Sequence, residues 1–276
     1  MAYKKILTIQ DISCVGQCSL TVALPIISAC GIETCILPSA VLSTHTAGFS
    51  GYTFRDLTDD IPRIVDHWKK EGIKFSAIYT GYLGSRRQIA YVRDILRDMG
   101  EADHVSIVDP AMADGGRLYP AFDIDYVEAM KGLCGDADIL LPNITEACFL
   151  TDTEYRETYD ESYIKLLFER LAELGAKNVV LTGVSYREGK TGVAVYDGRN
   201  VGYYEHEKMA RGSHGTGDIY ASAFTGAYVR GKGLFGSAKI AADFTLGCIK
   251  NSQGDGSHTY GAKFETALPD LIEMVE

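Results

Sequence analysis

The segment that most clearly suggests chemistry is a glycine-rich stretch that opens a helical run. Residues 211–218 read Arg-Gly-Ser-His-Gly-Thr-Gly-Asp, and the small-residue run 219–223 follows directly. Unpaired N–H groups and the positive end of a helix dipole make such a helix start a binding site for anions. An aspartate in the position of Asp218 is also typical of an N-cap, which is a structural role. The residues alone leave an anion site and a capped helix as alternatives.

Two common phosphate-binding motifs do not fit the chain. The dinucleotide fingerprint requires a glycine three residues after Gly217, where this chain has Tyr220. The run Gly189-Lys190-Thr191 resembles the end of a P-loop, but Val184 stands where the first glycine is required, and a strand-like run follows. These mismatches argue against a Rossmann dehydrogenase and a Walker-type NTPase.

Carboxylates offer a second candidate site. Asp109 and Asp114 follow one strand-like run, and Asn143 stands three residues before Glu146 after the next. Mg²⁺ takes oxygen ligands and keeps several of its waters, so one or two carboxylates beside a phosphate suffice to hold it. The spacing of Asn143 and Glu146 is also that of a capping box. A capping role and a magnesium role through water are compatible, and both remain open.

The elements that position these residues follow from the hydrophobic pattern. Alternating β-rich and amphipathic segments predict a mostly parallel sheet covered by helices on both faces, in one α/β domain over residues 1–276. Ligands of such sheets bind outside the carboxyl ends of the strands, where the polar residues fall. Two runs around a four-residue turn predict an antiparallel hairpin at the sheet edge. The strand-like runs are 6–9, 34–37, 77–80, 105–108, 139–141 and 179–182, the helical segments 60–71, 87–99, 163–174, 218–230, 235–250 and 263–275, and the hairpin runs 192–196 and 201–206.

Composition and charge exclude several classes of protein. The chain has 276 residues, 46% hydrophobic and 23% charged, which is typical of a folded soluble protein. A formal net charge of −10 argues against general affinity for nucleic acid or anionic membranes. The seven cysteines lack CxxC spacing and predict buried free thiols in a reducing, cytoplasmic location. Gln10 and Asp11 interrupt the first apolar stretch, so we expect no signal peptide.

Together, the motifs resemble those of the ribokinase-like superfamily. The matching segments are Asp109-Pro110 with Met112 and Asp114, Pro142-Asn143 with Glu146, and Gly215-Thr216-Gly217-Asp218. The runs 8–11 (Thr-Ile-Gln-Asp), 43–46 (Ser-Thr-His-Thr) and 80–82 (Thr-Gly-Tyr) are similar to the pyridoxal kinase branch. The resemblance spans nearly the whole chain in the same order. It implies a three-layer ribokinase-like fold and ATP-dependent phosphorylation of the 5′-hydroxymethyl group of pyridoxal, pyridoxamine or pyridoxine.

The resemblance also implies roles for individual residues. Asp218 matches the catalytic base, and the N–H groups of Gly215, Thr216 and Gly217 match the anion hole for the γ-phosphoryl group. MgATP and a B6 vitamer are the implied ligands, and a homodimer is the implied assembly. The other matched positions are Asp109, Asn143, Glu146, Thr182, Met209, Ala210, Arg211 and Thr216 for the nucleotide, Asp11, His45, Thr46, Tyr82 and Asp218 for the substrate, Gly115, Gly116 and Tyr119 for a flap, and Asp114 and Glu146 for Mg²⁺, partly through water.

Three positions depart from the family pattern. Asp11 stands where many relatives have a serine, and an acid there favours the cationic arm of pyridoxamine or a protonated pyridine ring, so we expect an altered vitamer preference. Leu141 replaces a threonine that helps some relatives hold a monovalent cation, which leaves activation by K⁺ or Na⁺ open. His214 is expected to be a loop residue whose charge neighbours phosphate.

Two other functions remain as alternatives. A hydroxymethylpyrimidine (phosphate) kinase shares the same fold, although this chain lacks the Gly/Ser-rich first loop expected of such a kinase. A non-catalytic nucleotide- or vitamer-binding protein would have lost the base or the anion loop. Asp218 and both flanking glycines are present, so the sequence favours an enzyme.

Overall fold

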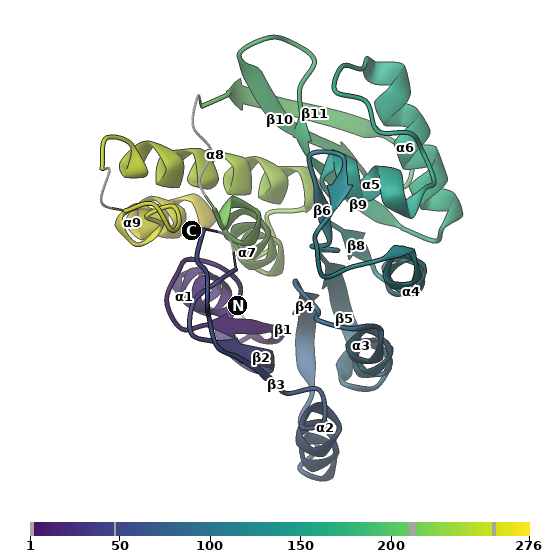
Figure 1. Cartoon of the computed structure of the whole chain (residues 1–276), viewed down its shortest axis with the longest axis vertical. Helices are drawn as coiled ribbons and strands as arrows, with labels where there is room; N and C mark the ends of the chain where they lie inside the picture. Colours follow the sequence, from purple (N-terminus) through teal and green to yellow (C-terminus); the bar gives the residue numbers. More distant parts are fainter. Residues whose placement is uncertain (1–2, 47, 210–213, 256–257) are drawn as a thin grey trace.

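The computed structural model describes residues 3–46, 48–209, 214–255 and 258–276. A mostly parallel sheet forms its centre (Figure 1). The strands are β1 (Lys5–Ser13), β2 (Glu33–Leu42), β3 (Phe54–Asp56), β4 (Phe75–Thr80), β5 (Gly100–Val108), β8 (Ile139–Leu140), β9 (Asn178–Val184), β10 (Lys190–Tyr196) and β11 (Val201–Glu207), and a separate small sheet holds β6 (Ala113–Asp114) and β7 (Arg117–Leu118). The helices are α1 (Leu20–Ala29), α2 (Ile61–Lys70), α3 (Arg86–Asp98), α4 (Ile124–Gly135), α5 (Ile144–Leu150), α6 (Glu161–Glu173), α7 (Thr216–Val229), α8 (Leu234–Ser252) and α9 (Leu268–Val275), with a 3-10 turn at Glu265–Ala267.

The strand order confirms the architecture predicted from the sequence. The sheet runs β11-β10-β9-β8-β5-β4-β1-β2-β3, and the neighbours from β9 to β2 are parallel. At one edge β10 and β11 form the predicted antiparallel hairpin. The short antiparallel strand β3 at the opposite edge was not predicted, because three exposed residues carry no alternating pattern.

Helices cover both faces of the sheet and give it three layers (Figure 1). The helices α1, α7, α8 and α9 share one buried hydrophobic cluster with residues such as Ile6 and Tyr79. The helices α2 to α6 share the other cluster with residues such as Leu7 and Ile9. Neighbouring residues of one strand thus face opposite layers, as the strand period of two requires.

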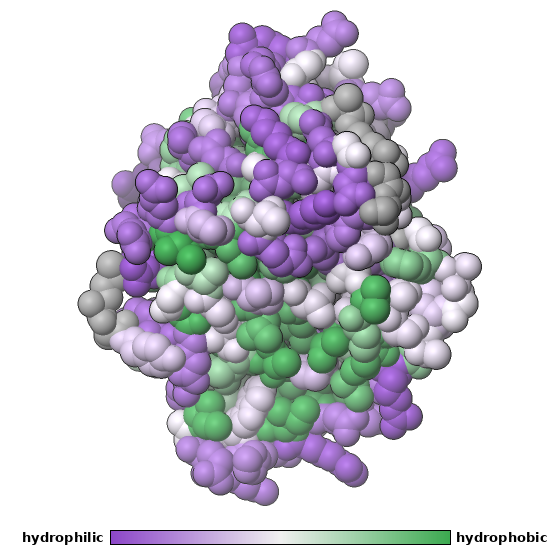
Figure 2. Space-filling view, turned by 90° about the vertical axis from the view of Figure 1, so that its left-hand side faces the viewer, coloured by the Kyte–Doolittle hydropathy of each residue, from purple (hydrophilic) through white to green (hydrophobic). Residues whose placement is uncertain are grey.

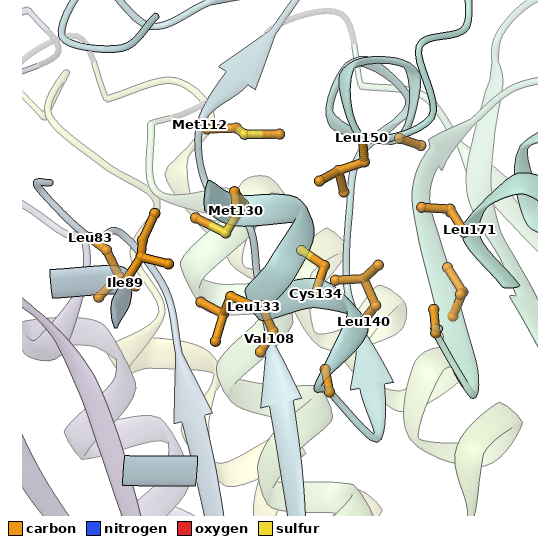
Figure 3. Packing of buried hydrophobic residues seen from close by; sticks show 14 of the residues in the cluster. Leu83, Ile89, Val108, Met112, Met130, Leu133, Cys134, Leu140, Leu150 and Leu171 are labelled. Atoms are coloured by element: carbon orange, nitrogen blue, oxygen red, sulfur yellow. The ribbon is translucent and has the colours of Figure 1, made fainter. Parts of the chain in front are cut away.

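Close packing on the second face fixes the end of β5, after which Asp109 follows. Figure 3 shows Met130, Leu133 and Cys134 of α4 directed toward Val108 and Leu140 at the ends of β5 and β8. These five side chains are almost fully buried. A carboxylate that follows such a strand is therefore attached to a rigid element.

Three helices that carry much of the packing were missed or misread from the sequence. The helix α1 is apolar at most positions and contains Pro25, which hides a helical period. The helix α4 was not predicted either. The segment predicted as one helix over 263–275 is a 3-10 turn followed by α9, which has Pro269 in its first turn.

One face of the molecule has a hydrophilic and a hydrophobic region. Figure 2 shows that hydrophobic side chains gather in the lower half of the face on the left of Figure 1, below a hydrophilic upper part. Four cysteines are buried free thiols as predicted, whereas Cys18 and Cys35 are half-buried and Cys14 is exposed. Over the described residues, no helix combines the length and the apolar character needed to cross a membrane.

Candidate active site

The start of α7 places open N–H groups at the carboxyl edge of the sheet. Gly215 is the N-cap residue, in the left-handed conformation (φ 75°, ψ 4°), so Asp218 lies in the first turn and the N-cap interpretation of Asp218 is wrong. The first backbone bond of the helix runs from the Ile219 N–H to the Gly215 carbonyl at 3.0 Å. The N–H groups before Ile219 have no acceptor within the helix. They are available to an anion.

Glycine is required at position 215 and is sterically optional at position 217. A Cβ at Gly215 would lie 1.7 Å from the Gln17 carbonyl oxygen, and the positive φ excludes most other residues as well. A Cβ at Gly217 would meet no atom of the described residues within 4 Å. The space over Gly217 is therefore open, as a phosphate-binding turn requires.

Asp218 faces two other carboxylates, Asp109 from the end of β5 and Asp11 from β1. Removal from water raises the pKa of the Asp218 carboxyl to about 7, the negative charges of Asp109 and Asp11 add to the rise, and a hydrogen bond from the Ser19 N–H opposes it. The side chain is only half-buried, so a ligand can reach it. A carboxylate with a pKa near neutrality is matched to proton abstraction.

Asp109 and Glu146 form a buried acidic pair next to Asp218. The Glu146 carboxylate accepts hydrogen bonds from the N–H groups of Met112 (3.0 Å) and Asn143 (2.9 Å), and the Asn143 side chain accepts one from the Glu146 N–H, which confirms the capping box. Burial and the charge of Glu146 hold the pKa of Asp109 well above its usual range, and burial raises the pKa of Glu146 to about 7. Two adjacent buried carboxylates are stabilised by a cation between them.

The donor set fits Mg²⁺ that also binds phosphate. Mg²⁺ commonly uses one or two carboxylates together with waters and phosphate oxygens. Within the described ranges, no cluster of three or more His, Cys, Asp or Glu side chains forms a metal cage by itself. Asp114, the other predicted ligand, lies exposed on β6, and its charge contributes to the raised pKa of Glu146. Asp109, Asp114 and Glu146 thus surround the same region.

These raised pKa values predict that the free protein becomes more stable as the pH falls from 8 to 6. Asp109, Glu146 and Asp218 bind protons more tightly when folded than when unfolded, so the free energy of unfolding decreases as pH rises from about 4 through about 7. Thermal unfolding without nucleotide or Mg²⁺ measures this. Asp109→Asn should raise Tm at pH 8 and make Tm depend less on pH.

The exposed Asp152 provides the matched control for that prediction, because Asp152→Asn removes the same charge from the surface. If Asp152→Asn flattens the pH dependence as much as Asp109→Asn does, general charge repulsion is the cause and the buried pair is not.

Asp11 lies inside a strand rather than in the loop expected after it. The strand β1 continues to Ser13 with an irregularity between Gln10 and Ile12. Asp11 is buried, and its two oxygens accept hydrogen bonds from Ser19 Oγ (2.6 Å) and Ser13 Oγ (3.1 Å). Burial raises the pKa of this carboxyl, and both hydroxyls oppose the rise. The charge of Asp11 lies close enough to Asp218 to raise the pKa of that carboxyl.

Two further predicted substrate residues lie near Asp11. Burial raises the pKa of Tyr82 to about 12, and the charge of Asp11 adds to the rise; the Tyr82 ring lies 5.4 Å from the ring of Phe122. His45 is buried and donates from Nε2 to the Tyr260 carbonyl at 2.8 Å, while its Nδ1 has no hydrogen-bond partner among the residues that the structure describes. That nitrogen is then an acceptor available to a ligand. Thr46 is exposed beside them.

A cavity of about 460 Å³ lies beside α5 and the hairpin β10–β11. Its volume is in the range of small-molecule sites. The predicted residues Asp114, Asn143 and Thr182 line it, whereas Asp109, Glu146 and Met209 do not. Ala210 and Arg211, also predicted for the nucleotide, lie outside the described residues.

Sequence reasoning missed most of the cavity wall. Tyr155, Tyr159, Tyr186, Arg187 and Lys208 line it. The Tyr159 hydroxyl accepts a hydrogen bond from the Ser185 N–H at 3.0 Å, and the rings of Tyr159 and Tyr186 lie 6.3 Å apart. The available signal was the tyrosines in the loops, Tyr155 and Tyr159 before the predicted helix 163–174 and Tyr186 after the predicted strand 179–182, since aromatic faces suit a nucleotide base. The two basic residues suit its phosphates.

The predicted flap is the small hairpin β6–β7. Gly115 and Gly116 form its turn with φ values of 56° and 76°. The Gly116 N–H donates to Thr145 Oγ1 at 3.0 Å, so the turn contacts α5. Burial raises the pKa of the Tyr119 hydroxyl, and the nearby charges of Glu146, Asp109, Asp114 and Asp218 raise it further. Tyr119 therefore faces the acidic groups.

Comparisons with known proteins find similarity over most of the chain. Residues 27–262 match the family model described as phosphomethylpyrimidine kinase. A hydroxymethylpyrimidine/phosphomethylpyrimidine kinase of Bacillus subtilis is 25% identical over 224 residues, which is 79% of each chain. The corresponding protein of Aquifex aeolicus is 32% identical over 117 residues, and the match spans less than half of either chain, 42% of this one and 45% of that protein.

Solved structures extend the similarity over almost the whole chain. A Bacteroides thetaiotaomicron protein assigned as a phosphomethylpyrimidine kinase superposes with a TM-score of 0.94 at 36% identity, covering 98% of this chain and 94% of that one. Its orthorhombic form with pyridoxal gives a TM-score of 0.91 at 37% identity, covering 98% and 96%. A pyridoxal kinase from Lactobacillus plantarum has 30% identity and a TM-score of 0.91, covering 98% and 97%.

Proposed function

Because the chain belongs to the phosphomethylpyrimidine kinase family, within the ribokinase-like superfamily, we propose that it phosphorylates the 5′-hydroxymethyl group of a B6 vitamer with MgATP. The observation that carries this proposal is the start of α7. Open N–H groups there lie beside Asp218, whose pKa is raised to about 7. Phosphoryl transfer requires mainly such positioning and charge stabilisation.

The proposed reaction uses few groups of this chain. The Asp218 carboxylate takes the proton of the vitamer hydroxyl, and the hydroxyl oxygen forms a bond to the γ-phosphorus. The bond between that phosphorus and the β–γ bridging oxygen breaks, and its electron pair leaves with ADP. The N–H groups of Gly215, Thr216 and Gly217 donate to the transferred phosphoryl oxygens without having to reorganise. Asp218 then releases its proton to water.

The nucleotide is proposed to bind in the 460 Å³ cavity, with its phosphates directed toward the start of α7. Tyr159 and Tyr186 provide aromatic surface for the base, and Arg187 and Lys208 provide positive charge. Asp109, Asp114 and Glu146 would hold Mg²⁺, partly through water. When bound, Mg²⁺ supplies positive charge to the phosphates. The role of the three carboxylates is to orient the waters that surround the ion.

Two substrate classes compete within this family. The Bacteroides thetaiotaomicron structure with pyridoxal and the Lactobacillus plantarum pyridoxal kinase support a B6 vitamer, since both resemble this chain over 98% of its length. The family model and the Bacillus subtilis relative support hydroxymethylpyrimidine as the alternative. We favour the vitamer because the Bacteroides thetaiotaomicron structure is a form with pyridoxal, although that protein is assigned as a phosphomethylpyrimidine kinase, and because the pyridoxal kinase of Lactobacillus plantarum is similar over 98% of this chain.

A coupled ADP-release assay separates the two substrates. Purified protein is tested with MgATP and each of pyridoxal, pyridoxamine, pyridoxine and hydroxymethylpyrimidine. We expect the highest kcat/KM with one of the three vitamers. A higher kcat/KM with hydroxymethylpyrimidine than with every vitamer would replace the proposal by its alternative.

Replacing Asp11 with serine should change the order of preference among the vitamers. The buried carboxylate lies near Tyr82 and His45 and favours a cationic group on the substrate. We expect Asp11→Ser to lower kcat/KM for pyridoxamine relative to pyridoxal by about tenfold, the effect of about 1.4 kcal/mol. The same four-substrate assay measures the ratio. If the ratio of kcat/KM for pyridoxamine to kcat/KM for pyridoxal is unchanged, Asp11 does not take part in choosing the substrate.

A further inference from the structure

Gln17 connects segments that lie far apart in the sequence. It lies between β1 and α1, and its side chain is buried. The side-chain Nε2 donates to both oxygens of the Glu265 carboxylate, at 2.8 and 2.9 Å. The side-chain Oε1 accepts a hydrogen bond from His258 Nε2 at 3.1 Å. One amide group therefore holds the segment 258–265 at both of its ends.

The Tyr260 carbonyl, inside this segment, is the acceptor for a predicted substrate residue. It accepts from His45 Nε2 at 2.8 Å and from the Gln17 N–H at 3.4 Å. Because a carbonyl only accepts, the proton of the neutral His45 ring is on Nε2, and Nδ1 carries the lone pair. His45 Nδ1 is buried and finds no hydrogen-bond partner in the described part of the chain. The Tyr260 carbonyl thus sets the tautomer that His45 presents to a ligand.

The backbone at Gln17 also packs against the start of α7. A Cβ at Gly215, the N-cap of α7, would lie 1.7 Å from the Gln17 carbonyl oxygen, so the two residues are in close contact. A Cβ at Gly16 would lie 2.0 Å from His45 Cδ2, so the imidazole lies directly against the residue before Gln17. The histidine and the turn at Gly215 therefore rest on two consecutive residues.

We propose that Gln17 is a positioning residue, which fixes His45 relative to the turn at Gly215 by clamping the segment 258–265 through its side-chain amide. This proposal rests on the proposed function, in which His45 contacts the substrate and the turn binds the transferred phosphoryl group. Phosphoryl transfer between two bound molecules depends on the alignment of the acceptor with the phosphate. Gln17 acts through these two contacts and not on the reacting atoms.

Two substitutions break the clamp from opposite sides. Gln17→Met keeps the length of the side chain and removes its donor and its acceptor. Glu265→Ala removes the partner carboxylate at an exposed position, where truncation leaves the core intact. Glu265→Gln keeps an acceptor oxygen for Gln17 Nε2 and serves as the conservative rescue. Thr266→Val is the matched control, because it removes the acceptor of a hydrogen bond from Asn251 (3.0 Å) at the next residue of the chain.

Steady-state ADP release should show the effect on the substrate side of the site. We expect kcat/KM for the vitamer to fall at least about 10-fold in Gln17→Met and in Glu265→Ala, since a small misplacement of reacting groups can cost about 100-fold. KM for the vitamer should rise and kcat should fall. The double variant should be no worse than the more impaired single variant, because both substitutions break the same bond. Glu265→Gln and Thr266→Val should keep wild-type kinetics.

MgATP binding and thermal unfolding separate positioning from a merely structural role. The lining of the 460 Å³ cavity, over the residues that the structure describes, includes none from 14–19 or 258–265. The Kd of a non-hydrolysable MgATP analogue should therefore stay at its wild-type value in every variant. All kinetics are measured below the Tm of each variant. A merely structural role would lower Tm and leave the KM of the folded enzyme for the vitamer unchanged.

The outcomes also separate this proposal from the proposed function. Wild-type kcat/KM in Glu265→Ala, or an equal loss in Thr266→Val, would overturn the role of Gln17 even if Gln17→Met fails to fold, and would leave the function intact. If hydroxymethylpyrimidine is the best substrate of the wild type, the variants are compared with it, and the role of Gln17 is tested in the same way. No turnover by the wild type with any of the four substrates would overturn both. A lower kcat/KM with a raised substrate KM in Glu265→Ala, absent in Glu265→Gln, supports the clamp.

Discussion

Asp218→Asn should lower kcat by at least about 100-fold, the contribution typical of a positioned general base. Asparagine keeps the shape of the side chain but cannot accept the hydroxyl proton. The N–H groups of α7 and the cavity wall are unchanged, so MgATP should bind with its wild-type Kd. Steady-state ADP release measures the first effect and isothermal titration calorimetry with a non-hydrolysable MgATP analogue measures the second.

The same substitution should make the free protein more stable at pH 8. Asp218 lies near the charges of Asp109 and Asp11, and a neutral side chain removes that repulsion. A variant that is less active and more stable shows that function is lost without unfolding. Turnover close to wild type would contradict the assignment of Asp218 as the base.

Gly217→Ala should abolish the anion site while the fold is retained. A Cβ at Gly217 has no atom of the described part of the chain within 4 Å, and the φ of Gly217 is not in the left-handed region, so we expect the fold to accommodate alanine there. Glycine to alanine at such a position stabilises a protein by about 0.4–1 kcal/mol. If phosphate oxygens lie against this turn, the methyl group displaces them from the N–H donors. We expect kcat to fall about 100-fold, the cost of losing one preorganised donor.

Gly247→Ala on α8 is the matched control for this prediction. Its Cβ also meets no atom of the described residues within 4 Å, and the position lies on a different helix. We expect a higher Tm in both variants and a loss of kcat only in Gly217→Ala. Equal wild-type activity in the two variants would show that phosphate does not contact the turn.

The parallel core and its edge hairpin were predictable because their signals are local. Buried β-branched runs such as 105–108 and 179–182 coincide with β5 and β9, and the turn 197–200 separates β10 from β11. The helix α1 was not predictable in this way. It packs between β1 and α7 and is apolar on most sides, so its environment determines its structure.

The acidic groups were predictable as single residues, whereas their interactions were not. Asp11, Asp109, Glu146 and Asp218 come from four separate segments, and their raised pKa values arise only when the fold removes them from water together. The side-chain contacts of Gln17 have no sequence signature, because its partners lie near the other end of the chain.

The net charge of −10 shows what composition can and cannot predict about the ligands of this protein. It argues against nucleic-acid polymers and anionic membranes, but a nucleotide can be held by N–H groups at a helix start, by Mg²⁺ on buried carboxylates and by two basic residues of one cavity. A count of lysines and arginines therefore does not reveal a site of this kind.

The most direct test of the proposed function is phosphorus NMR of the wild-type reaction. Purified protein is incubated with MgATP and an excess of pyridoxal, and the products are followed over time. The proposed chemistry predicts that ADP and a phosphate monoester of pyridoxal appear in equal amounts, and that neither appears with Asp218→Asn. ADP accompanied only by inorganic phosphate, or no turnover with any of the three vitamers, would contradict it.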